Sequence, residues 1–488
     1  MIVSVFGFAN AVLRRVASPS LAMDDAKTNV FTQVWQWGYQ PDNPPLYEWL
    51  LKLVQPLTGA GLEGFLLLKY ACLSIAAMAL HLLVRAYASD RVAFGTTVGM
   101  VLLYQVGWNF HQAFTHSALL VAAVAVWLWA ALRWWRAPGL KTAALLGMAT
   151  AIAMMSKYNA GLLVAGFFVA LASSPFGRGA LGRPTTLLIP LMAILALLPH
   201  GLWFLAQTEA YRETLDVTLG LEGSHLSRVG EGLGSLFISA VTFMLPWGLV
   251  YGALGRGLRP TPLLTEERLL IQTSLWTLGG LAVAVIAFGI GNVSERYLIP
   301  VLLPCAIGLT SHLLRRPKAP FGPWISITAA MAVLVLVLRA AAYLMPGPPF
   351  CDECRQFVPY AVLAEDVRDH IPEGAILLVR EENTGGNMVT QFPTSPVRVM
   401  TSLPLMNPIE DEGRPCFYLW SEGMVGGHRL QGDMAAMYDH QETVVINVPW
   451  QHPLKPAGWR QTKWALTPLN DETLYKNYCV KKKSPKQR

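Results

Sequence analysis

The sequence is poor in charged residues. Only 14% of its 488 residues are Asp, Glu, Lys or Arg, whereas 53% are hydrophobic. An ordinary soluble domain carries about 25% charged residues. The scarcity of charge excludes an ordinary soluble enzyme and indicates a polytopic membrane protein with a more polar part attached.

The polar clusters of the chain are not accompanied by the common nucleotide and metallohydrolase motifs. The chain contains no Walker loop, no GxGxxG and no HExxH beside its polar clusters. No cofactor is therefore assigned. A divalent cation could bind His111 and His116 together with Asp24 or Asp25, but no spacing demands one, so the metal remains unknown.

Cysteine is scarce as well, with six residues in the chain. Cys351 and Cys354 form a single CxxC, with no second CxxC and no surrounding thioredoxin-like βαβ unit. A structural disulfide in a compartment outside the cytoplasm is the simpler interpretation. Whether Cys416 pairs with Cys479 stays open at this stage.

Long apolar runs are what the sequence has in abundance. A span needs about 20 residues, and a short apolar N-terminus that could extend to about Leu21 brings the expected number of transmembrane helices to about 11. The other ten runs lie near Leu62 to Val84, Val92 to Trp108, Ser117 to Arg133, Thr142 to Ser156, Ala160 to Ser173, Thr185 to Leu205, Gly234 to Leu254, Leu269 to Ile290, Leu298 to Leu314 and Trp324 to Leu344.

The pattern changes after Pro346, where acidic residues and alternating stretches appear. Residues 375–379 and 443–448 alternate as strands do. We therefore predict an α-helical membrane domain over residues 1–346 and a small soluble α/β domain over residues 347–488, which ends in a basic tail.

Cationic residues mark one side of the membrane. They recur in every second loop, which the positive-inside rule places in the cytoplasm. The members are Arg85, Arg91, Arg133, Arg136, Lys141, Arg178, Arg183, Arg256, Arg259, Arg268, Arg315, Arg316 and Lys318. The net charge of +7 thus fits membrane topology and anionic lipid better than nucleic acid. The unusual polar residues and the C-terminal domain fall on the opposite, non-cytoplasmic face.

The first non-cytoplasmic stretch, residues 24–50, combines an acidic pair with an apolar segment. Asp24 and Asp25 open it, and Lys27 follows within one turn. They could simply be a helix cap and first-turn charges. The alternative is a site beneath an amphipathic interfacial helix, which would act as a lid and would end at Pro44 and Pro45. Its apolar side would carry Val30, Phe31, Val34, Trp35 and Trp37.

Further polar residues stand at the same ends of the spans. Histidines in such places are more often structural than catalytic, but the turn NFHQAFTHS has two, which favours a functional role. Lys157 could either snorkel to the membrane surface or bind phosphate. Arg296, which could merely pair with Glu295, offers a planar fork for phosphate. The complete set on this face comprises Tyr47, His111, His116, Lys157, Tyr158, Asn159, His200, Trp203, Glu295, Arg296 and Tyr297.

The ordered motifs resemble a known family. MDDAKTN, WGYQPDNPPLYEWL, FTHSALL, MSKYNAG, LPHGLW and ERYLIPVLLP follow one another in the chain, and CDECR and GGNMVTQFP extend the likeness. Together they are similar to bacterial glycosyltransferase family 39 of the glycosyltransferase C superfamily, which includes protein O-mannosyltransferases and the lipid A aminoarabinose transferase.

The resemblance implies a multi-pass enzyme of the bacterial inner membrane, with its active site and C-terminal domain on the periplasmic side. Such an enzyme passes a sugar, with inversion, from a polyprenyl-phosphate carrier to a lipid, glycolipid or protein acceptor. Asp24 matches the first acid of the family's acidic pair, and Asp25 replaces the usual Glu. The family often has a second acid ahead of the Thr-His-Ser turn. This chain has Gln112, Ala113 and Phe114 there.

We therefore expect Asp24, with Asp25 beside it, to take the acceptor proton. Lys157 and Arg296, with His116 and Lys27, would bind the donor phosphate. The remaining polar residues named above would line the substrate site, and the loop from Gln207 to Leu233 would help to close it. The alternatives are a lipid-linked sugar flippase or transporter, and an inactive scaffold; mostly charge-free spans and the lack of an inverted repeat argue against transport.

Overall fold

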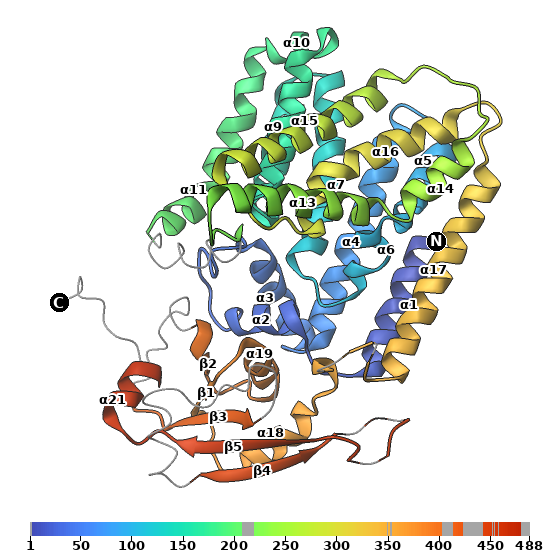
Figure 1. Ribbon diagram of the computed structural model, residues 1–488. Helices are drawn as coiled ribbons and strands as arrows, with labels where there is room; N and C mark the ends of the chain where they lie inside the picture. Colours follow the sequence, from blue (N-terminus) through green and yellow to red (C-terminus); the bar gives the residue numbers. More distant parts are fainter. Residues whose placement is uncertain are drawn as a thin grey trace. The chain divides into compact units, whose positions relative to one another are not determined.

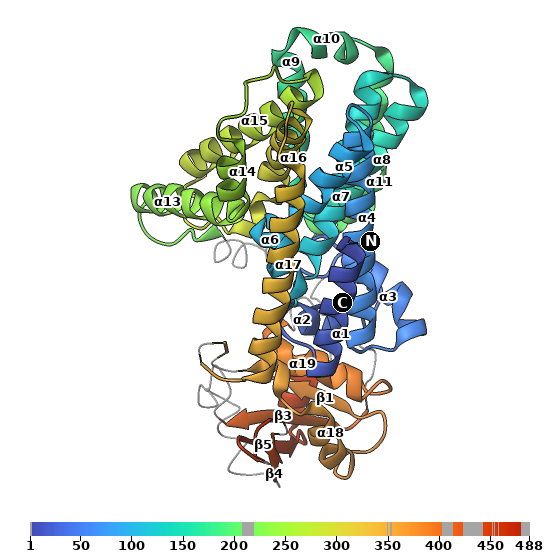
Figure 2. The same cartoon turned by 90° about the vertical axis from the view of Figure 1, so that its right-hand side faces the viewer.

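The computed structural model describes residues 2–206, 219–348, 350–351, 354–402, 413–422, 443–450, 452, 454–456 and 458–479. The chain forms two compact units (Figures 1 and 2). The membrane unit comprises Met1–Ala11, Gln36–Tyr47 and Lys69–Val337, and the C-terminal unit comprises Val12–Trp35, Glu48–Leu68 and Leu338–Arg488. The sequence-based division at residue 346 therefore differs from these units, because two early segments group with the C-terminal chain. The basic tail and the first part of the Gln207–Leu233 loop lie outside the described residues.

Helices make up the membrane unit. α7 and α16 form its interior. In the spans that contain them, 83% of an apolar 18-residue stretch is buried, compared with 17% in the span that contains α11. The helices of this unit, three of which continue into the other unit, are α1 (Ile2–Ala17), α4 (Leu62–Arg85), α5 (Asp90–Gly99), α6 (Tyr104–Gly107), α7 (His116–Arg136), α8 (Leu140–Ser156), α9 (Ala160–Ser173), α10 (Pro175–Leu181), α11 (Leu188–Leu205), α13 (His225–Met244), α14 (Trp247–Gly255), α15 (Thr265–Phe288), α16 (Ile299–Arg315) and α17 (Phe321–Leu344), with 3-10 turns η1 (Met100–Leu102), η2 (Asn109–His111), η3 (Pro184–Leu187) and η4 (Glu295–Leu298).

Glycines allow some of these helices to approach closely. A Cβ atom at Gly166 of α9 would lie 2.0 Å from the Thr277 hydroxyl of α15, and one at Gly147 of α8 would lie 2.8 Å from the Ile189 carbonyl of α11. Small residues at such contacts are typical of helices that pack in lipid, where close van der Waals packing rather than hydrophobic exclusion drives association.

The expected number of about 11 spans is not confirmed. Among the described residues, six helices are long and apolar enough to cross a membrane. The number is seven if α9 and α10, between which the chain bends by 112°, form one broken span. The run near 92–108 breaks after Gly99, against which Trp324 packs, and the run near 234–254 breaks at Pro246. Hydrophobicity alone does not reveal such breaks, because they depend on packing and on a missing backbone donor.

The C-terminal unit has a mixed five-stranded sheet, as the alternating stretches predict. Its strands are β1 (Ile376–Val379), β2 (Val397–Val399), β3 (Cys416–Glu422), β4 (Val444–Pro449) and β5 (Gln461–Pro468). They lie in the order β2-β1-β3-β5-β4, with β1 parallel to β2 and β3 and the other pairs antiparallel (Figure 1).

Side-chain alternation gives this sheet two buried faces. Leu377 and Val379 pack with helices α18 (Tyr360–Arg368) and α19 (Glu382–Gln391), whereas Ile376 and Leu378 pack on the other face with Leu474, from the short helix α21 (Glu472–Leu474). A π-helical turn, η7 (Tyr475–Cys479), follows, and 3-10 turns η5 (Arg355–Phe357) and η6 (Met400–Ser402) complete the unit. The expected alternation over residues 375–379 is therefore wrong: β1 is a continuous apolar run, because both of its faces are buried.

Two disulfides link parts of the C-terminal unit. One joins Cys351 to Cys354, and the other joins Cys416 at the start of β3 to Cys479. The second bond answers the question that the sequence left open. It ties the end of η7 to the sheet and fits an oxidising compartment.

Candidate active site

The acidic pair lies at the beginning of α2 (Met23–Phe31), in the C-terminal unit. The N-cap position is Ala22, so neither Asp24 nor Asp25 caps the helix, and both lie in its first turn. The helix dipole favours carboxylates there. Asp25 is only 1% exposed, and Asp24 is half-buried. Lys27 follows within the same helix, where it is also half-buried.

The α2 helix is shorter and more buried than an interfacial lid. It ends at Phe31, and the chain turns before α3 (Leu46–Thr58) begins. Val30 belongs to the core of the C-terminal unit, whereas Trp35 and Trp37 lie beyond the helix and are exposed. The expected single apolar side from Val30 to Trp37 is therefore wrong, because α2 uses its apolar residues to pack against α19.

Glycine and asparagine in α19 hold α2 closely. A Cβ atom at Gly386 would lie 2.0 Å from the Ala26 carbonyl oxygen. The Asn387 side chain accepts a hydrogen bond from Leu21 N (2.8 Å) and donates one to Leu21 O (3.0 Å). Asn29 of α2 in turn donates to Gly386 O at 2.8 Å. These contacts fix the backbone directly before and within the helix that carries the acidic pair.

The phosphate-binding candidates of the membrane unit form one cluster. Lys157 ends α8 as its C-cap residue, and its ammonium lies 3.3 Å from the Ser117 hydroxyl and 5.0 Å from the centre of the Tyr297 ring. The Arg296 guanidinium lies 5.9 Å from the same ring and 5.8 Å from that of Phe114. The structure thus brings Lys157 and Arg296 to the same tyrosine, where both can attract an anion.

His116 extends this cluster. It begins α7 next to Ser117, is 5% exposed, and its Nδ1 lies 3.0 Å from the Thr115 hydroxyl. The Tyr47 ring packs against the imidazole with 5.4 Å between ring centres. His116 and Tyr47 therefore occur beside the lysine side of the cluster.

A cavity of about 240 Å³ opens beside Lys157 in the membrane unit. Its polar lining consists of Asp42, Lys157, Tyr158, Asn159, Asn292 and Tyr297, and its apolar lining consists of Pro41, Leu162, Leu219, Leu281, Ile290 and Val293. An amphipathic cavity with a few polar groups is typical of a small-molecule site. The Asn159 side chain donates to the Tyr297 carbonyl oxygen (2.9 Å), which joins the α8–α9 turn to η4.

His200 and Trp203 hold the loop that leads to this cavity. The Trp37 carbonyl can only accept, so the 2.7 Å contact places the proton on His200 Nδ1. In the neutral ring, Nε2 then accepts from the Tyr158 hydroxyl at 2.9 Å. A Cβ atom at Gly38 would lie 2.0 Å from the Trp203 ring. These two residues therefore position the loop that precedes Pro41 and Asp42.

His111 and Glu295 have structural surroundings. His111 is buried between Phe6 and Tyr70, and its Nδ1 lies 3.2 Å from the Tyr70 hydroxyl. Glu295 accepts hydrogen bonds from Asn109 and Ser294, both at 3.3 Å. His111 thus packs against α1 and α4, and Glu295 is bonded to the first residue of η2 and to the residue that precedes η4.

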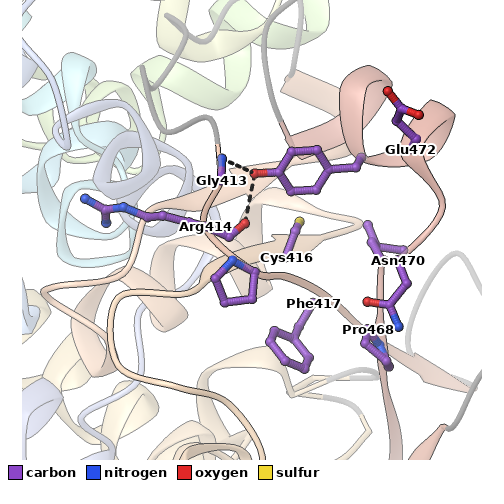
Figure 3. Close-up of a pocket in the computed structure, with 10 residues that line it drawn as sticks. Gly413, Arg414, Cys416, Phe417, Pro468, Asn470 and Glu472 are labelled. Atoms are coloured by element: carbon purple, nitrogen blue, oxygen red, sulfur yellow. Dashed lines mark hydrogen bonds between the residues drawn. The ribbon is translucent and has the colours of Figure 1, made fainter.

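A second hollow, of about 400 Å³, lies on the C-terminal unit (Figure 3). Its lining includes Arg414, Phe417, Glu472 and Tyr475, and the Tyr475 hydroxyl donates to Arg414 O and accepts from Gly413 N. None of the sequence-predicted site residues lines it. Across the described part of the chain, no three His, Cys, Asp or Glu side chains gather as a metal site would require.

The sequence-predicted residues thus form two groups. The membrane unit brings together Lys157, Arg296, Tyr297, Tyr158, Asn159 and, next to them, His116 and Tyr47. Asp24, Asp25 and Lys27 belong to the C-terminal unit, so their convergence with the cations remains a prediction. Sequence reasoning missed Asp42 and Ser117, although the carboxylate before Asn43-Pro44-Pro45 was a visible signal.

Comparisons with known proteins agree with this architecture. A family model described as dolichyl-phosphate-mannose-protein mannosyltransferase matches residues 42–203, which include Asp42, His116, Lys157 and His200. The lipopolysaccharide core galacturonosyltransferase RgtA of Rhizobium johnstonii is 27% identical over 416 residues, which cover 81% of each chain. RgtB of the same organism is 26% identical and covers 90% of this chain and 91% of its own.

The fold has a solved counterpart. ArnT from Cupriavidus metallidurans, crystallised with undecaprenyl phosphate, superimposes with a TM-score of 0.59 at 12% identity, over 94% of this chain and 97% of that one. The family model, the two relatives and this fold agree with the family resemblance drawn from the ordered motifs. Over most of its length the chain is related to the lipopolysaccharide core galacturonosyltransferases, and it shares the membrane-protein fold of ArnT.

Proposed function

We propose that this protein transfers a sugar from a polyprenyl-phosphate donor to a hydroxyl group of a lipopolysaccharide core or lipid A acceptor on the periplasmic face. The observation that carries the proposal is the position of Lys157 in the lining of a cavity that also has apolar walls, with Arg296 near the same Tyr297 ring. Such a cavity suits a ligand that is anionic at one end and apolar at the other.

The charge change of the reaction explains the need for two cations. The donor is a phosphodiester with one negative charge. The acceptor oxygen attacks C1 of the sugar, the bond from C1 to the phosphate oxygen breaks, and polyprenyl phosphate leaves with a second negative charge. Cations fixed in a site of low dielectric stabilise this departing charge more than they stabilise the ground state.

The acceptor hydroxyl must lose its proton as it attacks. Asp24, in the half-buried first turn of α2, is our candidate base, and Asp25 and Lys27 complete its surroundings. Attack from the face opposite the leaving phosphate inverts the anomeric carbon. The lipopolysaccharide acceptor is proposed because RgtA and RgtB act on the lipopolysaccharide core by name.

The test is a transfer assay in membranes. Undecaprenyl phosphates that carry radiolabelled mannose, glucose or galacturonic acid are supplied one at a time, and label is counted in lipid, lipopolysaccharide and protein fractions. We expect at least one label to move to the lipopolysaccharide fraction, and to stop moving in a Lys157→Met variant. Label that stays in the donor with every sugar contradicts the proposal.

A further inference from the structure

Two oxygen atoms at the cavity beside Lys157 have no hydrogen-bond donor within the described part of the chain. Asp42 Oδ1 and Asn159 Oδ1 are both buried, and neither has a hydrogen-bond donor among the residues that the structure describes. Both residues line the same cavity. A buried acceptor without a donor destabilises the folded protein, so two of them in one cavity indicate that a bound molecule supplies the donors.

The orientation of the Asn159 amide is fixed by its other contact. Its nitrogen lies 2.9 Å from the Tyr297 carbonyl oxygen. A carbonyl only accepts, so the nitrogen must face it, and the amide oxygen is left as the group for a ligand. Asp42 offers a second acceptor of the same kind, and as a carboxylate it is the stronger one.

The chemistry of the two acceptors selects among the parts of the donor. An ionised phosphate has no hydrogen to donate, and a prenyl chain has none either. A sugar ring carries several hydroxyl donors. A metal ion would also satisfy two oxygens, but the Lys157 ammonium lines the same cavity and opposes a second cation.

We propose that Asp42 and Asn159 form the sugar-binding subsite of the donor and accept hydrogen bonds from two hydroxyl groups of its ring, while Lys157 faces the phosphate. The inference rests on the proposed function and adds the residues that recognise the sugar. Asp42 also repels a carboxylate, so the carboxyl group of a uronic acid would face away from it.

The loop that carries Asp42 is already held in place. Tyr39 is fully buried and accepts a hydrogen bond from Gln36 N (3.2 Å). Trp37 is bonded to His200, Gly38 lies against Trp203, and Pro41 immediately precedes Asp42. A preorganised acceptor loses little conformational entropy when the ligand binds.

Binding of two kinds of lipid, without and with a sugar, to the purified full-length protein in nanodiscs tests the proposal. The probes are undecaprenyl phosphate, and undecaprenyl phosphate that carries glucose, mannose or galacturonic acid. In Asp42→Ala we expect the sugar-bearing lipid that binds wild type best to bind about 10- to 100-fold more weakly. Bare undecaprenyl phosphate should bind equally or more tightly, because a neighbouring negative charge has been removed.

Matched variants separate recognition from folding. Asp42→Asn keeps one acceptor oxygen and should lose less affinity than Asp42→Ala. Asp90→Ala, which removes an exposed carboxylate paired with Arg85, should change neither affinity. If Asp42→Ala weakens both lipids alike, or neither, the sugar subsite is wrong, whereas sugar transfer can still occur. If wild type binds none of the lipids, both the subsite and the proposed function fail.

Discussion

At the scale of single residues, Lys157 is the clearest candidate for leaving-group stabilisation. It ends α8 and is only 7% exposed. A cation at this point should act mainly as charge develops on the phosphate, so we expect Lys157→Met to lower kcat about 10²- to 10³-fold. The KM for the donor should rise less. Steady-state kinetics with the labelled donor checks this prediction.

The conservative variant Lys157→Arg is the control for lost charge. It keeps the cation but differs in length and shape. Partial recovery of kcat is expected. Equal kcat in Lys157→Met and wild type contradicts a role for this cation at the phosphate.

The buried tyrosines of the C-terminal unit predict a loss of stability in alkali. Burial raises the pKa of Tyr418 to about 12 from its ordinary value near 10. The folded state therefore favours the neutral phenol, and this contribution is complete below pH 10 and disappears as the pH rises through about 12. Burial also raises the pKa of Tyr360.

Thermal unfolding at pH 9 and pH 11 measures this effect. We expect Tm to fall between the two values, and to fall less in Tyr418→Phe, which has no phenol to ionise. The same decrease in both proteins contradicts the assignment to Tyr418.

At the scale of elements, the packing of α2 against α19 is the contact on which the acidic pair depends. In Gly386→Ala the new methyl group would lie 2.0 Å from the Ala26 carbonyl oxygen. The helices must separate, at a cost of about 1–3 kcal/mol. We expect a lower Tm. Transfer activity should also fall, because α2 and its acidic pair are displaced from their native position.

A second glycine provides the control. Gly279 in α15 has open space where a Cβ atom would stand. Gly279→Ala should leave Tm unchanged or raise it slightly, because Ala favours a helix more than Gly does. If Gly386→Ala behaves like Gly279→Ala, the close contact between α2 and α19 does not exist.

Element prediction succeeded where hydrophobicity alone decides the structure. The apolar runs anticipated α4, α7, α11, α15, α16 and α17, and the stretches 375–379 and 443–448 were correctly expected to be strands, β1 and β4. It failed at Gly99 and Pro246, where packing and backbone chemistry interrupt apolar runs. The length of α2 was also missed, because its partner α19 lies more than 350 residues further along the chain.

The candidate site could be predicted only in part for the same reason. Residue type pointed to Lys157 and Arg296, and the structure places both at Tyr297. Residue type could not distinguish His111, which packs between Phe6 and Tyr70, from His116, which begins α7 beside Ser117. Asp42 was overlooked because its importance comes from a cavity formed by residues distant in sequence.

At the scale of the whole molecule, the two compact units divide the proposed chemistry. The membrane unit holds the cations and the cavity, and the C-terminal unit holds the acidic pair on α2. Segments 12–35 and 48–68, although early in the chain, belong to the unit that contains the sheet. The proposed base and the proposed phosphate-binding cations therefore belong to different units of the chain.

The most direct test of this account is single-turnover sugar transfer by Asp24→Asn, with Asp25→Asn measured beside it. Loss of a general base typically costs about 10²- to 10⁴-fold in rate. We predict a loss in this range for Asp24→Asn, with unchanged binding of bare undecaprenyl phosphate and normal membrane insertion, and a smaller loss for Asp25→Asn. Transfer by Asp24→Asn at the wild-type rate would contradict the proposed mechanism.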